Sequence, residues 1–280
     1  MPKSLISSHN MGMSFAFVMG TTGELIKMFP LLIESDRREI DWKVWHTGQS
    51  GVAFLNQWRD FQLPEERLLR GISSSSDLAE NSKALAWFVK AICAPLKDLS
   101  KSTGETSQIW VHGDTLSTLV GAAWAFRLKC PLIHVEAGLR SGSLVQPFPE
   151  EMIRRLVSTR AHLHCPPNDV SFELLAKKYP SSQLVHSGVN TLREALDLVF
   201  SQNPSQLPEE KFVVANLHRF ENLSHSYRWQ KIIETVQRVA VKFPVYWFLH
   251  PSTQKKLREE APEAIVNNPR VHLRERLPFT

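Results

Sequence analysis

Three carboxylates stand where the packing of a globular protein does not require charge. Asp114 lies three residues after one apolar run, Glu136 comes directly after another, and Glu150 opens a stretch with helical periodicity. A carboxylate beside a buried strand is costly unless it is paired or functional. Two such groups around a substrate carbon can act as base and acid in a proton transfer.

Each carboxylate also has a purely structural interpretation. Asp114 can cap the helix that follows it, and Glu136 can be the partner of an arginine. Glu150 lies four residues before Arg154. This is the spacing of an ordinary ion pair on a helix surface.

Cationic and small residues near other strand ends suit an anionic ligand. The turn Gly20-Thr21-Thr22-Gly23-Glu24 leads into a helix that carries Lys27 one turn later. The N–H groups of such a turn can receive a phosphate or hydroxyl group, although a tight turn without a ligand also needs glycine. His218 and His250 follow two later apolar runs, where a histidine either contacts an anion or sugar or belongs to a satisfied loop.

Short apolar segments alternate with amphipathic ones along the chain. Runs rich in Val, Ile, Phe and Trp predict strands, and segments of helical periodicity separate them. The predicted strands are 15–19, 42–45, 109–111, 132–135, 184–186, 212–215 and 245–249. The predicted helices are 24–34, 77–99, 116–128, 150–158, 170–178, 192–200 and 227–241. This alternation favours an α/β fold with parallel strands, in which ligands bind at the carboxyl ends of the strands.

The segment 201–210 divides the chain into two predicted domains. Its polar residues and two prolines interrupt the pattern after a helix and before a strand. We therefore expect a complete doubly wound sheet in residues 1–202. Residues 203–280 have room for three strands and two or three helices, about half of such a sheet.

Composition excludes several classes of protein. Hydrophobic residues make up 42% and charged residues 22%, which is typical of a globular protein and not of a disordered chain or a coiled coil. The 33 Lys and Arg against 28 Asp and Glu give +5, which suits an anionic ligand without favouring nucleic acid. Three scattered cysteines and no long apolar run predict a cytoplasmic protein without disulfides or membrane insertion. The sequence has neither zinc-ligand spacing nor a Walker A loop or a G-x-S-x-G motif.

Taken together and in this order, the motifs resemble the non-hydrolysing UDP-N-acetylglucosamine 2-epimerase family. The resemblance extends from about Met13 to the last residues. The segments that carry it are Gly20-Thr21 with Glu24-Leu25-Ile26-Lys27-Met28 and Pro30-Leu31, Val111-His112-Gly113-Asp114-Thr115, His134-Val135-Glu136-Ala137-Gly138-Leu139-Arg140, Pro147 to Glu151 with Arg154, Ser187-Gly188 with Asn190-Thr191, His218-Arg219 with Glu221-Asn222, and His250-Pro251.

The resemblance implies a fold, a reaction and a set of site residues. The fold is two Rossmann-like domains in the GT-B arrangement. The reaction interconverts UDP-GlcNAc and UDP-ManNAc by eliminating UDP to a 2-acetamidoglucal and adding it back, without a metal or other cofactor. The implied catalytic residues are Asp114, Glu136, Glu150 and His218, and the implied substrate-binding residues are Lys27, Arg154, Gly20, Thr21, His250 and Arg140. We expect the clustered acids to raise one another's pKa. The resemblance also implies a homodimer.

The sequence departs from the family pattern at several positions. Thr22 and Gly23 stand where the family has Arg and Pro, Phe220 replaces an arginine, and Gln49-Ser50-Gly51 replaces Gln-His-Arg. The Asp-Ser-Gly-Gly segment and the paired glutamates that hold the nucleotide are absent, so we expect weaker UDP binding and an exposed strand edge. Three alternatives stay open: a hydrolysing epimerase that yields ManNAc and UDP, a GT-B glycosyltransferase, and a non-catalytic sugar-nucleotide-binding protein.

Overall fold

The chain divides into two compact units, with the boundary between residues 203 and 204. The structure is a computed structural model, and it describes residues 14–70, 81–94, 108–143, 148–202, 208–217, 220–260, 263–275, 277 and 279. Each unit is described by itself.

The first unit is built on a parallel sheet of seven strands in the order β3-β2-β1-β4-β5-β6-β7. The strands are β1 Ser14–Met19, β2 Asp41–His46, β3 Leu68–Arg70, β4 Gln108–His112, β5 Leu132–Val135, β6 Leu163–Cys165 and β7 Gln183–Leu184. All residues of β1 and β5 are buried, as expected for a parallel sheet covered on both faces. The chain order reverses between β1 and β4, which places the ligand-binding switch point of the sheet after these two strands.

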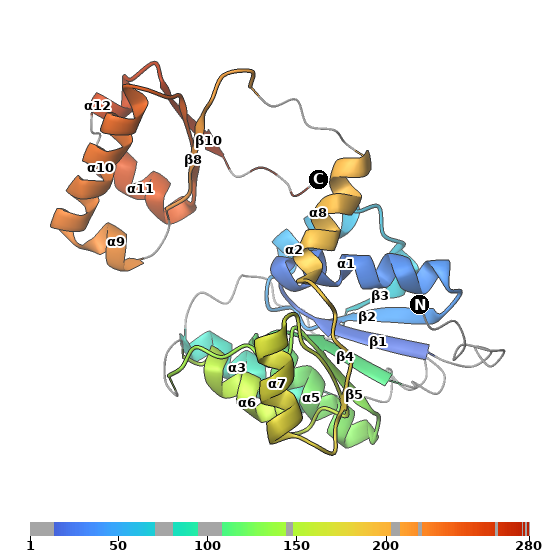
Figure 1. The fold of residues 1–280 in the computed structure, drawn as a ribbon. Helices are drawn as coiled ribbons and strands as arrows, with labels where there is room; N and C mark the ends of the chain where they lie inside the picture. Colours follow the sequence, from blue (N-terminus) through green and yellow to red (C-terminus); the bar gives the residue numbers. More distant parts are fainter. Residues whose placement is uncertain are drawn as a thin grey trace. The chain divides into compact units, whose positions relative to one another are not determined.

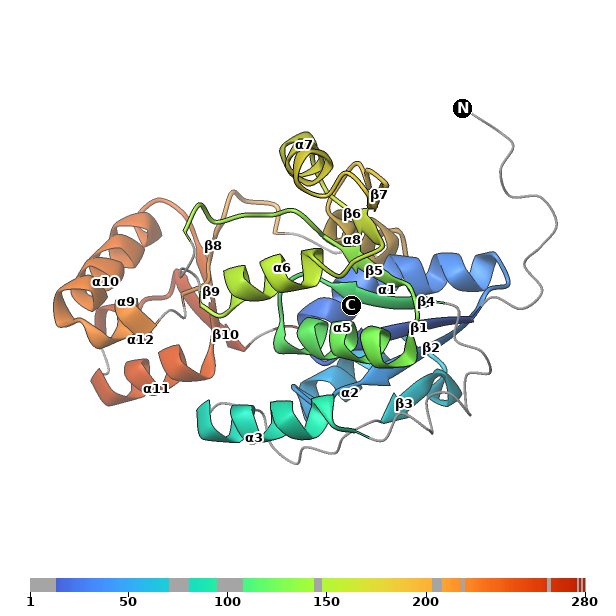
Figure 2. The same ribbon diagram turned by 90° about the horizontal axis from the view of Figure 1, so that it is seen from below.

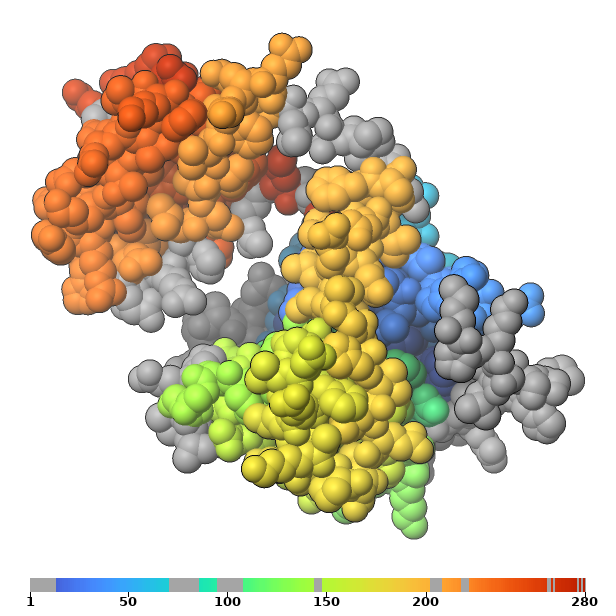
Figure 3. Space-filling view, in the orientation of Figure 1, coloured from blue at the N-terminus to red at the C-terminus, as the bar shows by residue number. Residues whose placement is uncertain are grey.

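Helices cover both faces of this sheet. They are α1 Thr22–Arg37, α2 Gly51–Asp60, α3 Asn81–Ile92, α5 Leu116–Leu128, α6 Glu150–Ser158, α7 Asp169–Lys178 and α8 Thr191–Gln202, with a 3-10 turn at Glu65–Arg67. Figures 1 and 2 show α1 on one face of the sheet and α5 with α3 on the other. α8 packs against α1, and the two lie side by side in yellow-orange and blue in Figure 3.

The core under α5 joins this helix to the central strands. Trp124 on α5 is fully buried, lies 4.9 Å from the ring of Trp45, and donates from its indole N–H to the carbonyl of Ala91. Gly121, one turn earlier, brings the helix backbone close to Val111 and Val18. Close packing here fixes the start of α5, and with it the loop that follows β4.

The second unit has a parallel sheet of three strands in the order β10-β9-β8. The strands are β8 Val213–Ala215, β9 Val245–Leu249 and β10 Val271–Glu275, and the helices are α9 Phe220–Ser224, α10 Ser226–Ala240, α11 Pro251–Glu260 and α12 Glu263–Val266. Trp229 and Trp247, both buried, centre its core. No helix in the described parts of the chain is long and apolar enough to cross a membrane.

The α/β class and most predicted elements are confirmed. Helices 116–128 and 150–158 and strands 132–135 and 245–249 have the predicted bounds. The predicted strand 184–186 is Gln183–Leu184. Of the predicted helix 77–99, Asn81–Ile92 is helical, residues 93 and 94 are not, and the remaining ends lie outside the described residues. Prediction missed β3 and β6, each of three residues, and α2, whose N-cap Ser50 makes no side-chain capping bond. In the second unit the three expected strands are present, but the prediction gave no bounds for β10, α9, α11 and α12.

Two glycines test the packing of the helices. An alanine Cβ at Gly121 would lie 2.4 Å from Val111 Cγ1 and 3.0 Å from Val18 Cβ. Overpacking of this kind costs about 1–3 kcal/mol, more than the helix propensity that alanine adds, ~1 kcal/mol at most. Gly121→Ala should therefore lower the free energy of unfolding in urea. The control Gly23→Ala, where a Cβ meets nothing within 4 Å, should be neutral or stabilising; equal stability of both variants would contradict the packing.

Candidate active site

The loops after β1, β4 and β5 meet at the switch point of the first sheet. β4 pairs with both β1 and β5, and the amide of Gly113 continues the ladder by donating to the carbonyl of Val135 at 3.0 Å. Glu136 then has a left-handed backbone, with φ of 59°. For a residue with a Cβ this conformation costs roughly 1–2 kcal/mol. Backbone strain of this kind is common at functional sites.

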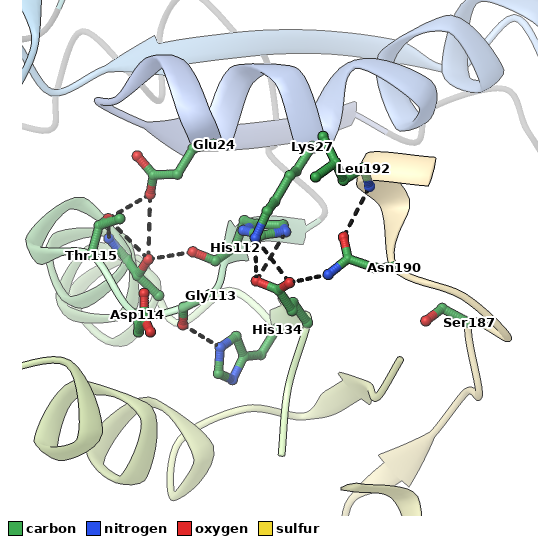
Figure 4. A network of polar contacts seen from close by, with 12 residues as sticks. Glu24, Lys27, His112, Gly113, Asp114, Thr115, His134, Ser187, Asn190 and Leu192 are labelled. Atoms are coloured by element: carbon green, nitrogen blue, oxygen red, sulfur yellow. Dashed lines mark hydrogen bonds and ion pairs between the residues drawn. The ribbon is translucent and has the colours of Figure 1, made fainter. Parts of the chain in front are cut away.

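Glu136 accepts hydrogen bonds from two other segments of the first unit (Figure 4). Lys27 Nζ on α1 lies 2.9 and 2.8 Å from its two carboxylate oxygens, and the side-chain amide of Asn190 donates to Oε1. The side chain of Glu136 is 11% exposed, against 28% for Lys27. His112 Nε2 lies 3.7 Å from Glu136 Oε2. The structural interpretation of Glu136 as the partner in an ion pair is therefore confirmed, but the partner is Lys27 on α1 and not an arginine.

Asp114 forms the second ion pair of this edge. Its carboxylate contacts the guanidinium of Arg154 on α6, and Arg154 also lies 3.6 Å from Glu151. Asp114 and Arg154 are 26% and 20% exposed, so a small molecule can reach both. Asp114 does not cap α5, because the capping side chain is that of Thr115.

Glu151 is fully buried and gathers three arginines. Its oxygens lie 2.8 Å from Arg155 Nε, 3.6 Å from Arg154 and 3.9 Å from Arg140. Burial alone would raise the pKa of Glu151, but the amide of Ser141 and the guanidinium groups of Arg155 and Arg140 outweigh it and lower this pKa. The burial of Arg140 itself lowers the pKa of this guanidinium. This network ties the loop after β5 to α6 and orients Arg154.

Glu150 does not form the ion pair with Arg154 that its spacing suggested. Arg154 turns to Asp114 and Glu151 instead, and Glu150 Oε2 is buried without a hydrogen-bond partner in the part of the chain that the structure describes. The expected mutual contact of the acids is likewise replaced by cation partners, Lys27 for Glu136 and Arg154 for Asp114. Glu150 therefore differs from Asp114 and Glu136 in having a buried carboxylate oxygen without a partner among the described residues.

The amides of Gly20 and Thr21 are not available to a ligand. Both donate to Glu24 Oε2 at 2.9 Å, and Gly20 is buried. The expectation that these two N–H groups receive a phosphate is therefore wrong for this structure. The amides of Thr22 and Gly23, at the first two positions of α1, are the ones that remain.

The predicted residues of the second unit are described in part. His218 lies outside the described residues. His250 follows β9, and its Nδ1 lies 2.9 Å from Ser252 Oγ in the first turn of α11.

Arg140, in the first unit, was also predicted to bind substrate. It contacts Glu151 and the carbonyl of Leu139.

Four buried histidines lie on β2, β4, β5 and β6, two of them on the site strands β4 and β5. Burial lowers the pKa of His112 and of His134 to about 3, and that of His46 and of His164 to about 4. The charge of Lys27 lowers the pKa of His112 further. His134 Nε2 lies 2.8 Å from the carbonyl of Gly113, which only accepts, so the neutral ring carries its proton on Nε2. These histidines are structural neutral groups at physiological pH.

Sequence reasoning missed Glu24, Glu151 and Asn190 as members of the site. Asn190 and Glu151 stand in segments that carry the family resemblance, but no spacing rule relates them to Asp114 or Glu136. Glu24 did have a local signal, because Thr21-x-x-Glu24 is a capping-box pattern, and both of its reciprocal bonds are formed.

A parallel sheet with ion-paired carboxylates at its switch point is typical of an α/β enzyme with a polar substrate. A family model described as UDP-N-acetylglucosamine 2-epimerase matches residues 34–280. The Bacillus subtilis (strain 168) UDP-N-acetylglucosamine 2-epimerase is 31% identical over 93% of this chain and 68% of its own length. This chain therefore belongs to the UDP-N-acetylglucosamine 2-epimerase family, whose members are isomerases of carbohydrates.

Solved structures agree with this assignment. A crystal structure of the Neisseria meningitidis UDP-GlcNAc 2-epimerase bound to UDP-GlcNAc is 27% identical, with a TM-score of 0.74 over 95% of this chain and 73% of that one. A complex of Staphylococcus aureus MnaA with UDP has the same identity and TM-score and is covered to 69%. The neighbours support the GT-B-like fold.

The buried histidines predict a dependence of stability on pH. Their pKa values lie below the 6.5 of an ordinary histidine, so the unfolded chain takes up protons first, and stability present above pH 6.5 is lost as the pH falls toward 4. His164→Phe keeps an aromatic ring against Tyr179 and removes two nitrogens that have no partner within the described residues. The slope of unfolding free energy below pH 6.5 should fall by about one proton, ~1.4 kcal/mol per pH unit, in urea titrations. The half-buried His272→Phe is the control; an unchanged slope for His164→Phe would contradict the prediction.

Proposed function

We propose that this chain binds UDP-GlcNAc and interconverts it with UDP-ManNAc. The observation that carries the proposal is the pair of cation-held carboxylates, Glu136 with Lys27 and Asp114 with Arg154, at the switch point of a sheet in a member of this family. The N. meningitidis relative, crystallised with UDP-GlcNAc, supports the choice of substrate.

In the proposed reaction a carboxylate removes the proton from C2 while the C1–O bond breaks and UDP leaves with the bonding electrons. The 2-acetamidoglucal then receives a proton at C2 on the opposite face, and a UDP oxygen adds to C1. The carbon that loses its proton has no adjacent carbonyl group, so base and acid must be held in place on both faces. Glu136 is fixed by Lys27 and Asn190, and Asp114 by Arg154. Glu150, whose Oε2 has no partner among the described residues, is the third proton carrier we propose.

The second unit is the proposed site of the nucleotide, and the first is the proposed site of proton transfer. In the second unit we assign His218 and His250 to the departing diphosphate, because a histidine can donate a hydrogen bond to a phosphate and both follow predicted strands in the sequence. In the first unit, the Thr22 and Gly23 amides at the start of α1 are the N–H groups we assign to an anionic ligand. We also propose a homodimer, on the family resemblance, and a cytoplasmic location, which the small number and wide spacing of Cys93, Cys130 and Cys165 support.

A glycosyltransferase is a weaker candidate for this site. The sucrose-phosphate synthase of Thermosynechococcus elongatus has a TM-score of 0.57 at 13% identity, a likeness of fold alone. Transfer of a sugar needs no proton carriers at C2. Glu136 is held by two segments distant in sequence, which favours a reaction that uses a positioned carboxylate.

The activity is tested with UDP-GlcNAc in deuterium oxide, followed by NMR. We expect UDP-ManNAc with deuterium at C2. Free ManNAc with UDP would instead identify a hydrolysing epimerase. Absence of both deuterium exchange and product at high protein concentration would overturn the proposed activity for this chain.

Site variants should separate chemistry from folding. Glu136→Gln and Asp114→Asn keep the shape of the side chains and remove the proton acceptor, so deuterium exchange should fall by roughly 10²–10⁴-fold. Glu34→Gln on the same helix as Lys27 is the control, because that carboxylate is exposed and pairs with Arg37 and Arg38. Exchange at the wild-type rate in Glu136→Gln would exclude this carboxylate as a proton carrier.

A further inference from the structure

Glu24 is a buried carboxylate at the meeting point of two helix N-termini. Only 2% of the residue is exposed. Its Oε2 accepts from the amides of Gly20 and Thr21, both at 2.9 Å, and from the Thr21 hydroxyl at 3.0 Å. Its Oε1 accepts from the hydroxyl of Thr115 at 2.6 Å. Figure 4 shows Glu24 reaching from α1 to Thr115.

Two helix caps therefore converge on one side chain. Thr21 is the N-cap of α1, and Thr115 is the N-cap of α5. Thr115 accepts from the amide of Thr118 at 3.2 Å and gives its only hydroxyl proton to Glu24. The Thr118 hydroxyl lies 2.6 Å from the carbonyl of His112, which takes its proton. The Thr118 hydroxyl also lies 3.4 Å from Glu24 Oε1 and 3.2 Å from the Thr115 hydroxyl, so Glu24 contacts two residues at the start of α5.

An ordinary capping box does not account for this burial. The capping glutamate of such a box needs only the N-cap amide, and the motif is complete at Thr21 and Glu24 without α5. Among the described residues no cation pairs with Glu24, although burying an unpaired carboxylate is costly. Desolvation raises the pKa of Glu24, which makes the neutral acid easier to reach. Burying this carboxylate costs more free energy than a helix cap alone requires. The contact that Glu24 makes between α1 and α5 explains the burial.

The two helices that Glu24 joins carry the two sides of the site. Lys27, one turn further along α1, holds Glu136. Asp114, directly before Thr115, holds Arg154. The β4–β5 ladder places the two ion-paired carboxylates on neighbouring loops, and the contact of α1 with the start of α5 adds a second constraint on their relative position. Glu24 makes that contact without touching either carboxylate.

We propose that Glu24 is a positioning residue of the reaction: it braces the N-termini of α1 and α5 against each other and so holds Lys27, the partner of Glu136, in register with the loop that carries Asp114. The proposal rests on the proposed function for its kinetic consequence, but the brace itself can be measured without substrate. A brace is also reciprocal, because loosening either helix must loosen the other.

Amide hydrogen exchange of the whole chain tests the brace directly. Thr115→Ala should speed exchange not only at the start of α5 but also at Gly20, Thr21 and Glu24, by about fivefold, the factor that corresponds to a lost cap of ~1 kcal/mol. Thr115→Ser keeps the hydroxyl and should leave these amides protected. Asn168→Ala removes the cap of α7, where Asn168 Oδ1 accepts from Ser171, and should act on α7 alone. Faster exchange confined to α5 in Thr115→Ala would overturn the brace.

Kinetics test the consequence for the reaction. Glu24→Ala should lower kcat for C2 deuterium exchange by roughly 10–100-fold with little change in KM, since a misplacement of about 1 Å has effects of this size. Glu24→Gln should restore most of the loss, because its carbonyl can accept from both amides and its NH₂ group can donate to Thr115. Asn168→Ala should lower stability and leave kcat unchanged.

The outcomes separate the two proposals. A wild-type chain without exchange activity contradicts the proposed function, and the amide-exchange result still decides whether Glu24 is a brace. An active wild type with normal kcat in Glu24→Ala overturns the positioning role. If Glu24→Gln is as slow as Glu24→Ala, the charge of Glu24 matters and not its geometry, which also contradicts the proposal.

Discussion

The ion pair of Lys27 with Glu136 is the interaction on which the arrangement of the site depends. It joins residues 109 positions apart, one on the helix after β1 and one directly after β5. Because β4 lies between these strands, the pair spans the switch point of the sheet. A carboxylate with so little exposure needs a partner. Glu136 also has a strained left-handed backbone conformation, which the ion pair helps to stabilise.

The remaining charges follow the same rule of paired burial. Glu151 is surrounded by arginines, Asp114 has Arg154, and Glu24, without a cation, is satisfied by amides and hydroxyl groups. Hydrogen bonds and opposite charges compensate for the loss of water around each carboxylate. The histidines of the same strands are kept neutral by burial, so they add no charge to a region already dense in it. The carboxylate oxygens that can take part in the reaction are therefore few, and their positions are well determined.

The sequence predicted the fold better than it predicted the contacts of the site. Long periodic elements such as α5 and apolar strands such as β5 have the expected bounds because hydrophobic periodicity is a local property. The pairing of Lys27 with Glu136 could not be derived this way, since it depends on which strands become neighbours. Local spacing was also misleading: Glu150 and Arg154 are four residues apart, yet Arg154 binds Asp114, a partner supplied by another strand. The capping box at Glu24 was visible in the sequence, but its bond to Thr115 required the order of β1 and β4.

The charge balance at the switch-point edge of the first sheet bears on the role of the first unit. Lys27 is engaged by Glu136, Arg154 by Asp114 and Glu151, and Arg155 and Arg140 by Glu151. With Glu24 these residues comprise four cations and four carboxylates, which leaves no surplus positive charge for a diphosphate. Thr22 and Gly23, where the family pattern has an arginine and a proline, add none. Cations that all hold carboxylates are suited to orienting these carboxylates for proton transfer, which agrees with the role proposed for the first unit.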